Sequence, residues 1–325
     1  MLEEVPMFLV CGEALFDMFA HSGAEGALTF AAHRGGSPYN VAVGLARLGS
    51  PTGFFAGVST DFFGDMLYAA LMEEGISPDY LVRKPNPTTL SFVLLSAART
   101  PRYTFFGEGA ADRTLLPADI PNLSDTVTTL HFGSFALVVA PVADTLLRFG
   151  RAMAGQRLIS YDPNIRLSVV PDIALWRARV GDWLAIADIV KVSQEDLQSL
   201  YPGADEREIA RSWAAQGPGL VVVTYGGAGA MAFLGGAEIK VPAPAVTVED
   251  TVGAGDAFQA GLLHGLRQHG VVSRAALENL RHDALRATLN LAATAGALTC
   301  TRVGADLPRI AQVLEMLEAK PQTPV

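Results

Sequence analysis

The sequence predicts an α/β protein with a doubly wound, mostly parallel sheet flanked by helices and a second, small β-sheet beside it. Strand-like and helix-like segments alternate along most of the 325 residues. Continuous apolar strands such as LVVVT, residues 220–224, are typical of a parallel sheet that helices cover on both faces. Half of the residues are hydrophobic and 18% are charged, so the chain can bury a substantial core.

The front of the chain alternates strand, helix, strand and helix. The first helix has Ser37 as its expected N-cap, Pro38 in its first turn and Gly49 where it stops. The four expected elements are a strand in 7–19 (MFLVCGEALFDMF), a helix in 37–49 (SPYNVAVGLARLG), a strand in 52–59 (TGFFAGVS) and a helix in 61–75 (DFFGDMLYAALMEEG).

The later part of the chain repeats this alternation. Expected strands are 126–135 (TVTTLHFGSF), 157–162 (RLISYD), 188–193 (DIVKVS) and 219–226 (GLVVVTYG). Expected helices are 142–155 (VADTLLRFGRAMAG), 172–187 (DIALWRARVGDWLAIA), 194–201 (QEDLQSLY) and 205–217 (DEREIARSWAAQG). Right-handed crossovers between such strands give a doubly wound domain.

Two stretches, 13–34 and 88–112, contain alternating strand patterns without an intervening helix. They predict a small antiparallel sheet outside the main α/β domain, which takes residues 1–12, 35–87 and 113–325. The pattern alone leaves two interpretations open, a lid over a binding site and an ordinary edge hairpin.

Composition argues against several functional classes. The net charge of −9 and the lack of a dense Lys/Arg stripe predict no nucleic-acid partner. Neither a signal peptide nor an apolar run long enough for a membrane span is recognisable, so we expect a cytoplasmic protein with no membrane partner. Cys11 and Cys300 lie far apart in apolar contexts and are expected to be free thiols.

The stretch EDTVGAGDAF, residues 249–258, opens a helical pattern after a strand-rich segment. Free backbone N–H groups at a helix N-terminus attract anions, and Gly253 and Gly255 leave that backbone open to a ligand. A carboxylate beside such an anion site suits a base that takes the proton of an acceptor hydroxyl in phosphoryl transfer, a role for Asp256. The local alternative is that Asp256 only interacts with the helix dipole.

Other nucleotide signatures are missing. The sequence has no G-x-x-x-x-G-K-[ST] and no G-x-G-x-x-G, which argues against P-loop, dinucleotide-binding and protein-kinase folds. A second glycine turn at 225–229 (YGGAG) follows a buried strand and could let a nucleotide lie on the backbone. Alone this signal is weak, because turns between strands often carry glycines.

Taken together, these motifs resemble the PfkB/ribokinase family of sugar kinases. HRGGSPYNVAVGLARLG (33–49) is similar to the first family signature and DTVGAGDAF (250–258) to the second. GEALFD, DPNIR, VKVSQEDL, VVVTYGGAGA and TRVGA follow the family order as well, so the resemblance covers essentially the whole chain and is strongest to bacterial fructokinases. It implies a ribokinase-like fold with a small β-sheet lid, which often mediates dimerisation, and MgATP as phosphoryl donor.

The resemblance implies a role for individual residues. Asp256 matches the base that deprotonates the sugar hydroxyl, and Asn40 could instead cap its own helix. The matched sets are the anion hole (Gly253, Ala254, Gly255), the sugar-binding positions (Asp17, Gly35, Gly36, Asn40) and the positions around the nucleotide (Thr224, Gly226, Gly229). Asn164 and Arg166 in DPNIR are expected to face the substrate, with a structural ion pair as the alternative for Arg166.

The metal positions depart from the family pattern. Ser193 and Asp196 stand where the family has N-x-x-E, so the resemblance implies a water-mediated Mg²⁺ contact through Asp196 and leaves Ser193 as a nucleotide neighbour or a helix cap. In members that bind a monovalent cation, the corresponding positions here are Asp250 and Val252. Activation by K⁺ and the contacts to the adenine ring stay open.

The resemblance favours phosphorylation of fructose to fructose 6-phosphate. The alternatives are 2-keto-3-deoxygluconate kinase, ribokinase and, from another class, a sugar-binding regulator without turnover. Kinases of 2-keto-3-deoxygluconate often carry an arginine just before the lid turn, where this chain has Gly107 and Glu108. Glu108 disfavours an acidic sugar, unless Arg102 or Arg113 compensates.

Overall fold

The computed structural model describes residues 5–22, 28–95 and 101–319. An eight-stranded sheet forms its centre, with the strand order β14-β13-β12-β11-β10-β9-β1-β4. The pairs from β4 to β12 are parallel, and β13 and β14 add an antiparallel edge. The strands are β1 (Met7–Cys11), β4 (Thr52–Phe55), β9 (Val127–Gly133), β10 (Leu158–Asp162), β11 (Ile189–Ser193), β12 (Leu220–Thr224), β13 (Ala230–Leu234) and β14 (Ala237–Val241).

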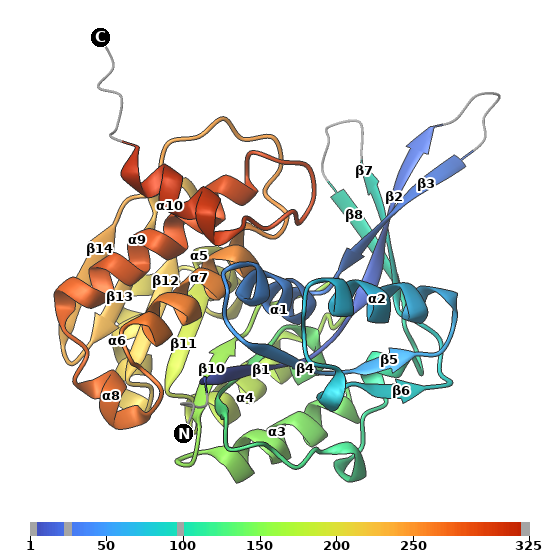
Figure 1. Cartoon of the computed structure of the whole chain (residues 1–325), viewed down its shortest axis with the longest axis horizontal. Coiled ribbons are helices and arrows are strands. Elements are labelled where there is room, and N and C mark those ends of the chain that lie inside the picture. Colours follow the sequence, from blue (N-terminus) through green and yellow to red (C-terminus); the bar gives the residue numbers. More distant parts are fainter. Residues whose placement is uncertain (1–4, 23–27, 96–100, 320–325) are drawn as a thin grey trace.

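Helices cover both faces of this sheet, as Figure 1 shows. One face packs against α1, α2 and α7–α9, and the other against α3–α6. The helices are α1 (Ser37–Arg47), α2 (Phe62–Glu73), α3 (Val142–Met153), α4 (Ile173–Leu184), α5 (Gln194–Leu200), α6 (Glu206–Gln216), α7 (Ala254–Gln268), α8 (Arg274–Glu278), α9 (His282–Thr299) and α10 (Ile310–Glu318).

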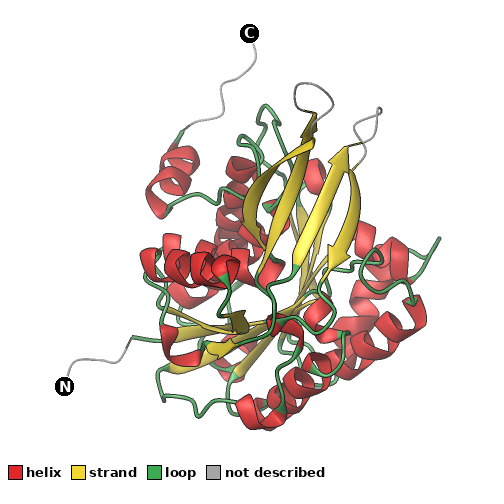
Figure 2. Cartoon of the chain, turned by 90° about the vertical axis from the view of Figure 1, so that its right-hand side faces the viewer, coloured by secondary structure: helices red, strands yellow, loops and turns green. Residues whose placement is uncertain are grey.

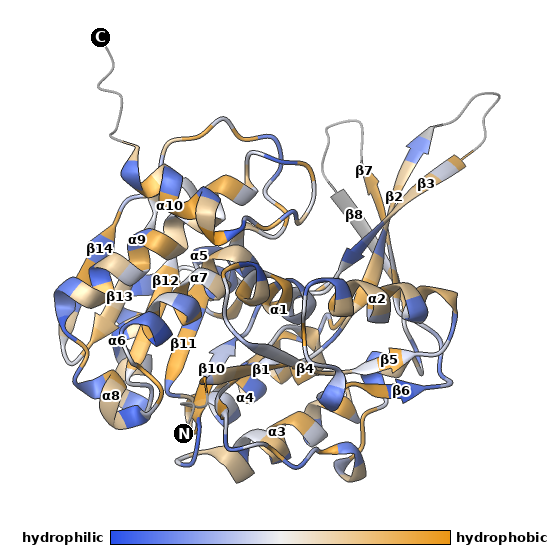
Figure 3. Cartoon of the chain, viewed as in Figure 1, coloured by the Kyte–Doolittle hydropathy of each residue, from blue (hydrophilic) through white to orange (hydrophobic). Residues whose placement is uncertain are grey.

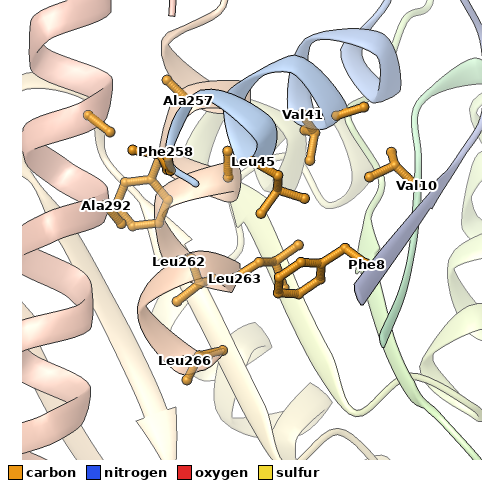
Figure 4. Close-up of a cluster of buried hydrophobic side chains, with 14 of the residues drawn as sticks. Phe8, Val10, Val41, Leu45, Ala257, Phe258, Leu262, Leu263, Leu266 and Ala292 are labelled. Atoms are coloured by element: carbon orange, nitrogen blue, oxygen red, sulfur yellow. The ribbon is translucent and has the colours of Figure 1, made fainter. Parts of the chain in front are cut away.

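Strand side chains alternate between two separate hydrophobic cores. Phe8 and Val10 of β1 point into the core under α1 and α7, whereas Leu9 and Cys11 point into the core under α3–α6. Figure 4 shows Val41 and Leu45 of α1 in the first core with Leu262 and Leu266 of α7. Much of β11 is coloured hydrophobic in Figure 3, as expected for a strand buried on both faces. The predicted doubly wound α/β fold is confirmed.

A second sheet of four strands stands away from the main sheet (Figure 2). Its order is β3-β2-β7-β8, with antiparallel outer pairs and a parallel central pair. The strands are β2 (Leu15–Ser22), β3 (Leu28–Gly35), β7 (Leu90–Leu95) and β8 (Pro101–Phe106). The short strands β5 (Gly57–Ser59) and β6 (Val82–Lys84) pair separately. The small sheet therefore comes from the two stretches that lack helices in the sequence pattern.

Four local predictions were wrong. Residues 52–59 are not one strand, because β4 ends at Phe55 and β5, which begins at Gly57, belongs to another sheet. The small sheet is mixed and not antiparallel, because its central pair, β2 and β7, is parallel. Residues 7–19 form two strands in different sheets, because β1 ends at Cys11 and β2 begins at Leu15. Ser37 is not the N-cap of α1: Gly36 is, and Ser37 lies in the first turn with its hydroxyl turned elsewhere. Cys11 and Cys300 are free thiols, as predicted. No helix of the described ranges is both long and apolar enough to cross a membrane.

Candidate active site

The N-terminus of α7 lies at the carboxyl ends of the parallel strands, next to α1. Gly253 is its N-cap in a left-handed conformation (φ 78°), and a side chain there would also collide with Ala305. Within the described residues, the N–H groups of Gly253, Gly255 and Asp256 have no hydrogen-bond partner, whereas that of Ala254 donates to the Thr251 carbonyl at 3.2 Å. Three free amides at a helix N-terminus can bind an anion.

Asp256 is buried in the first turn of α7 and is held from α1. The Ser37 hydroxyl donates to its Oδ1 at 2.6 Å, and the Asn40 amide donates to its Oδ2 at 2.8 Å. Burial raises the pKa of the Asp256 carboxyl, and these two hydrogen bonds with the charges of Lys191 and Arg166 offset part of that rise. The Asn40 side chain therefore holds Asp256 and does not cap its own helix.

The two glycines before α1 make room for two carboxyl residues. A Cβ on Gly35 would lie 2.3 Å from Oδ2 of Asp17 on β2, and one on Gly36 would lie 2.8 Å from the Glu13 carbonyl oxygen. Gly36 also has φ 101°, which disfavours any other residue. Burial raises the pKa of Asp17, and the nearby Ser91 hydroxyl and the charges of Arg166 and His33 oppose that rise.

Glu13 is a buried carboxyl that the sequence reasoning did not assign. Its side chain is 1% exposed, and burial raises its pKa to about 8, so it holds a proton at neutral pH. The nearby Ser134 side chain and the charge of Arg166 oppose that rise, and Asp112 adds to it. Burial also raises the pKa of Asp112 to about 6. The signal in the sequence was a single carboxylate directly after an apolar strand.

Arg166 follows β10 and faces several carboxyl groups at once. Its positive charge lowers the pKa values of Glu13, Asp17, Asp196 and Asp256. Its own side chain is exposed and donates to the Ile165 carbonyl at 3.0 Å. No ion pair involves it within the described ranges, so the guanidinium is available to a substrate oxygen.

Asn164 precedes Arg166 in a left-handed conformation. Its φ is 40°, and its side chain is 7% exposed. Asparagine tolerates this conformation better than most residues do, which suits a tight turn at the end of β10. The turn places Asn164 at the same sheet edge as Asp162, the last residue of that strand.

Lys191, like Glu13, is a buried residue of the site that the sequence did not predict. It lies in β11 and donates to Oδ2 of Asp162 on β10 at 2.8 Å, with side chains 4% and 1% exposed. The charges of Asp162, Asp256 and Asp196 raise the pKa of Lys191 by more than burial lowers it. A lone lysine within the apolar strand pattern of 188–193 was the available signal.

Ser193 and Asp196 lie at the start of α5. Ser193 is its N-cap, accepting from the Asp196 N–H at 3.0 Å, which is the capping alternative considered from the sequence. Asp196 is buried and accepts from the Ile165 N–H at 3.0 Å. Burial and the nearby charge of Asp162 raise the pKa of Asp196, whereas Arg166 and Lys191 lower it.

The expected nucleotide positions follow β12 at the same sheet edge. Thr224 ends this strand, and Gly226 opens a single 3₁₀ turn, Gly226–Ala228. A Cβ on Gly226 would meet no atom within 4 Å, whereas one on Gly229 would lie 2.1 Å from the Val241 carbonyl oxygen. Gly226 therefore offers open backbone, and Gly229 permits the close approach of β14.

Asp250 fastens the loop that precedes α7. Its Oδ1 accepts from the Val252 N–H at 3.1 Å and its Oδ2 from the Gly304 N–H at 2.8 Å. Both carboxylate oxygens of Asp250 thus accept hydrogen bonds from the backbone. The main-chain carbonyl oxygens of this loop are then the groups that a cation could bind. No cluster of three or more acidic, histidine or cysteine side chains suited to a metal occurs in the part of the chain that the structure describes.

The structure describes the side chain of only one of the two arginines considered from the sequence, Arg102 and Arg113. The side chain of Arg102 lies outside the described residues. The Arg113 guanidinium lies 5.0 Å from the Phe135 ring centroid, and a Cβ on Gly107 would lie 2.6 Å from its Nη2. Glu108 is exposed in the same turn. The charge of Arg113 lowers the pKa of Asp112.

Known proteins of similar sequence identify the family of this chain. The family model for pfkB family carbohydrate kinases matches residues 9–311. The chain belongs to this family. A fructokinase from Rhizobium leguminosarum bv. trifolii is 38% identical over 280 residues, which is 86% of each chain.

Solved structures of the pfkB family agree with the fold. Fructokinase with bound ATP from Xylella fastidiosa has a TM-score of 0.86 at 30% identity, covering 96% of this chain and 98% of its own. A double mutant of fructokinase from Vibrio cholerae O395, in a form bound to fructose, ADP and potassium ion, has a TM-score of 0.85 at 29% identity, covering 98% and 100%. The ribokinase-like fold expected from the resemblance is confirmed.

Proposed function

We propose that this pfkB family kinase transfers the γ-phosphoryl group of ATP to fructose, giving fructose 6-phosphate. The observation that carries the proposal is the buried carboxyl of Asp256, which Ser37 and Asn40 hold beside three free amides of α7. A base next to an anion site is the arrangement that phosphoryl transfer to a hydroxyl requires. The names of similar proteins favour fructose, and two similar structures contain ATP or ADP.

Each group has one part in the transfer. Asp256 accepts the proton of the sugar hydroxyl as its oxygen forms a bond to the γ-phosphorus, and the bond from that phosphorus to the bridging oxygen of ADP breaks. The amides of Gly253, Gly255 and Asp256 stabilise the charge of the transferring group. Ala254 belongs to the same turn, which its own N–H helps to hold. The sugar is oriented by the side chains of Asp17, Asn40, Asn164 and Arg166 and by the backbone at Gly35 and Gly36. The nucleotide is bordered by Thr224, Gly226 and Gly229, with Ser193 nearby.

The residues present fit Mg²⁺ held through water. Mg²⁺ keeps several waters and needs few protein carboxylates, and Asp196 supplies one at the edge where the phosphates would lie. When bound, Mg²⁺ neutralises phosphate charge. We also propose the carbonyl oxygens of Asp250 and Val252 as ligands for K⁺, because the Asp250 carboxylate already fixes their loop.

We further propose that the small sheet is a lid, with 13–34 and 88–112 as its segments, and that two chains associate through its outer face. Asp17 and Ser91 lie on the inner face, toward the site. The opposite face carries an aromatic row in which Phe92 lies 5.1 Å from Phe30 and 5.4 Å from Phe106, ring centroid to ring centroid. Phe106 is 62% exposed, and an apolar face of this kind favours a second copy.

A panel of acceptors tests the proposal. The protein is incubated with MgATP and fructose, 2-keto-3-deoxygluconate, ribose or adenosine, and ADP release is measured. Fastest turnover with fructose is expected. Preference for 2-keto-3-deoxygluconate or ribose would replace the proposed sugar while keeping the chemistry. Sugar binding without ADP release would point to a regulator and refute the kinase assignment.

A further inference from the structure

Lys191 is a buried cation beneath the first turn of α7. Its ammonium group pairs with Asp162 at 2.8 Å, and both side chains are almost fully enclosed. An unpaired charge at such a depth is costly, so the pair needs both partners to be tolerated. Replacing such a pair with neutral groups often costs a protein nothing, which means that stability alone does not explain why a lysine is here.

The lysine reaches past its partner to the catalytic helix. A Cβ on Gly255 would lie 3.3 Å from Nζ of Lys191. Gly255 lies within α7 and has no left-handed conformation that requires glycine. Because Gly255 has no side chain, the ammonium group of Lys191 can lie against the backbone of α7, one residue before Asp256.

The titratable groups around this pair come from four elements. Lys191 is influenced by Asp162 of β10, Asp256 of α7 and Asp196 of α5. The fourth group is His131 of β9, whose pKa is lowered to about 3 by burial and by Lys191, so it is neutral. His131 also meets the Ser160 hydroxyl at 3.1 Å.

Two cations act on Asp256 itself. Its carboxyl is surrounded by Ser37, Asn40, Lys191 and Arg166. Arg166 is exposed, where water and salt weaken its field, whereas Lys191 is 4% exposed. Lys191 is therefore the cation whose effect on Asp256 persists in solution.

We propose that Lys191 is a positioning residue that keeps Asp256 ionised, so that this carboxylate can accept the proton of the sugar hydroxyl. The inference rests on the proposed role of Asp256 as base and adds Lys191 to it. Asp162 then serves to hold the ammonium group under α7. The competing account is that the pair only fills the interior between β10 and β11.

The decisive variant removes the charge without leaving its partner alone. Lys191→Met alone leaves Asp162 as a buried, unpaired carboxylate, which destabilises the fold. Lys191→Met with Asp162→Asn removes both charges and is expected to fold. A matched control is Lys84→Met with Asp119→Asn, because Lys84 and Asp119 also pair at 2.8 Å but lie outside the site.

The readout is the pH dependence of kcat/KM for fructose. Loss of the Lys191 charge makes ionisation of Asp256 harder, and loss of the Asp162 charge makes it easier. Because the ammonium group of Lys191 lies against Gly255 of α7, the first effect should outweigh the second, and the acid limb of the profile should move to higher pH in the Lys191/Asp162 double variant. The limb of the Lys84/Asp119 variant should coincide with that of the parent protein. An unchanged limb in a folded Lys191/Asp162 variant would leave only the space-filling account.

A second readout is independent of turnover. The Asp256 carboxyl carbon can be titrated by ¹³C NMR in the protein without substrates, its signal being the one that Asp256→Asn removes. Its titration should move upward in the Lys191/Asp162 variant, and identical titrations would overturn the proposal. A parent protein that phosphorylated no sugar would refute the proposed function, while this titration would still decide the role of Lys191.

Discussion

At the scale of single residues, buried carboxyls link the active site to stability. Glu13 lies between the backbone at Gly36 and the side chain of Ser134, with Asp112 nearby. Its folded-state pKa of about 8 is far above the value of 4.5 for the free side chain. The folded protein therefore keeps a proton on Glu13 over a pH range in which the unfolded chain has lost it.

This difference predicts a pH-dependent stability. Below pH 4.5 both states hold the proton; between that pH and about 8 only the folded state does, so stability falls as pH rises through this range. The loss by pH 8 should be on the order of 5 kcal/mol, because the pKa values of 4.5 and about 8 lie about 3.5 units apart and each unit corresponds to about 1.4 kcal/mol. Glu13→Gln should remove most of this slope in denaturant unfolding measured at pH 5 and pH 8.

The matched control for Glu13 is Glu315→Gln, an exposed position on α10. It should leave the slope of stability with pH unchanged. Equal slopes for Glu13→Gln and the parent protein would mean that Glu13 is already ionised in the fold.

The sequence predicted Asp256 as the base but did not predict the residues that hold its side chain. Asp256 could be found because glycines and a helix start surround it in one short stretch. Ser37 and Lys191 are 219 and 65 residues away from it in the chain, and a local pattern does not report such partners. Ser37 was taken for a cap because cap preference is a local property, whereas its actual partner comes from α7.

At the scale of elements, small residues let α7 approach its neighbours. A Cβ on Gly44 of α1 would lie 2.7 Å from the Cβ of Ala260, and one on Gly261 of α7 would lie 2.7 Å from Cα of Ala292 on α9. Backbone cannot move aside as a side-chain end can. Asp256 therefore has its position because α7 is wedged between α1 and α9 at close range.

These contacts predict opposite effects for two glycine-to-alanine changes. Gly261→Ala should lower the free energy of unfolding by about 1–3 kcal/mol, because the new methyl group meets the α9 backbone. Gly181→Ala, in α4 with no atom within 4 Å of the new Cβ, should raise it by about 0.5–1 kcal/mol through helix propensity. Chemical denaturation measures both, and a Gly261→Ala protein as stable as the Gly181→Ala protein would contradict the packing argument.

Helices and strands could be predicted where the hydrophobic pattern of the sequence is periodic. Their boundaries could not be predicted where the chain passes from one sheet to another. The break at Gly12–Ala14 falls inside one apolar stretch, so 7–19 looked like a single strand. What divides it is Gly12, where any side chain would lie 2.3 Å from Cγ of Pro38. That contact exists only in the folded molecule.

At the scale of the whole molecule, the small sheet has one face toward the site and one toward solvent. Its outer aromatic row, Phe30, Phe92 and Phe106, lies near the start of α2, where Phe62 is 72% exposed and packs against Phe63. Phe63 in turn contacts Phe16 of β2. A second chain would cover the exposed members of this aromatic cluster, which are Phe30, Phe62 and Phe106.

The association predicts a specific sensitivity to charge. The parent protein should have twice the mass of the 34.3 kDa chain in light scattering, and Phe106→Asp should shift it toward the single chain. Leu175→Asp, at a 37% exposed leucine on α4 outside the small sheet, should leave the mass unchanged. A parent protein that is a single chain at micromolar concentration would contradict the proposed association.

The central claim is that Asp256 is the base of a sugar kinase, and its most direct test is the turnover of Asp256→Asn. Asparagine keeps the shape of the side chain but cannot take the proton. With fructose and MgATP, kcat should fall by about 10²-fold or more, while ATP binding by the amides of α7 persists. A variant that folds and retains a kcat near that of the parent protein would contradict the account.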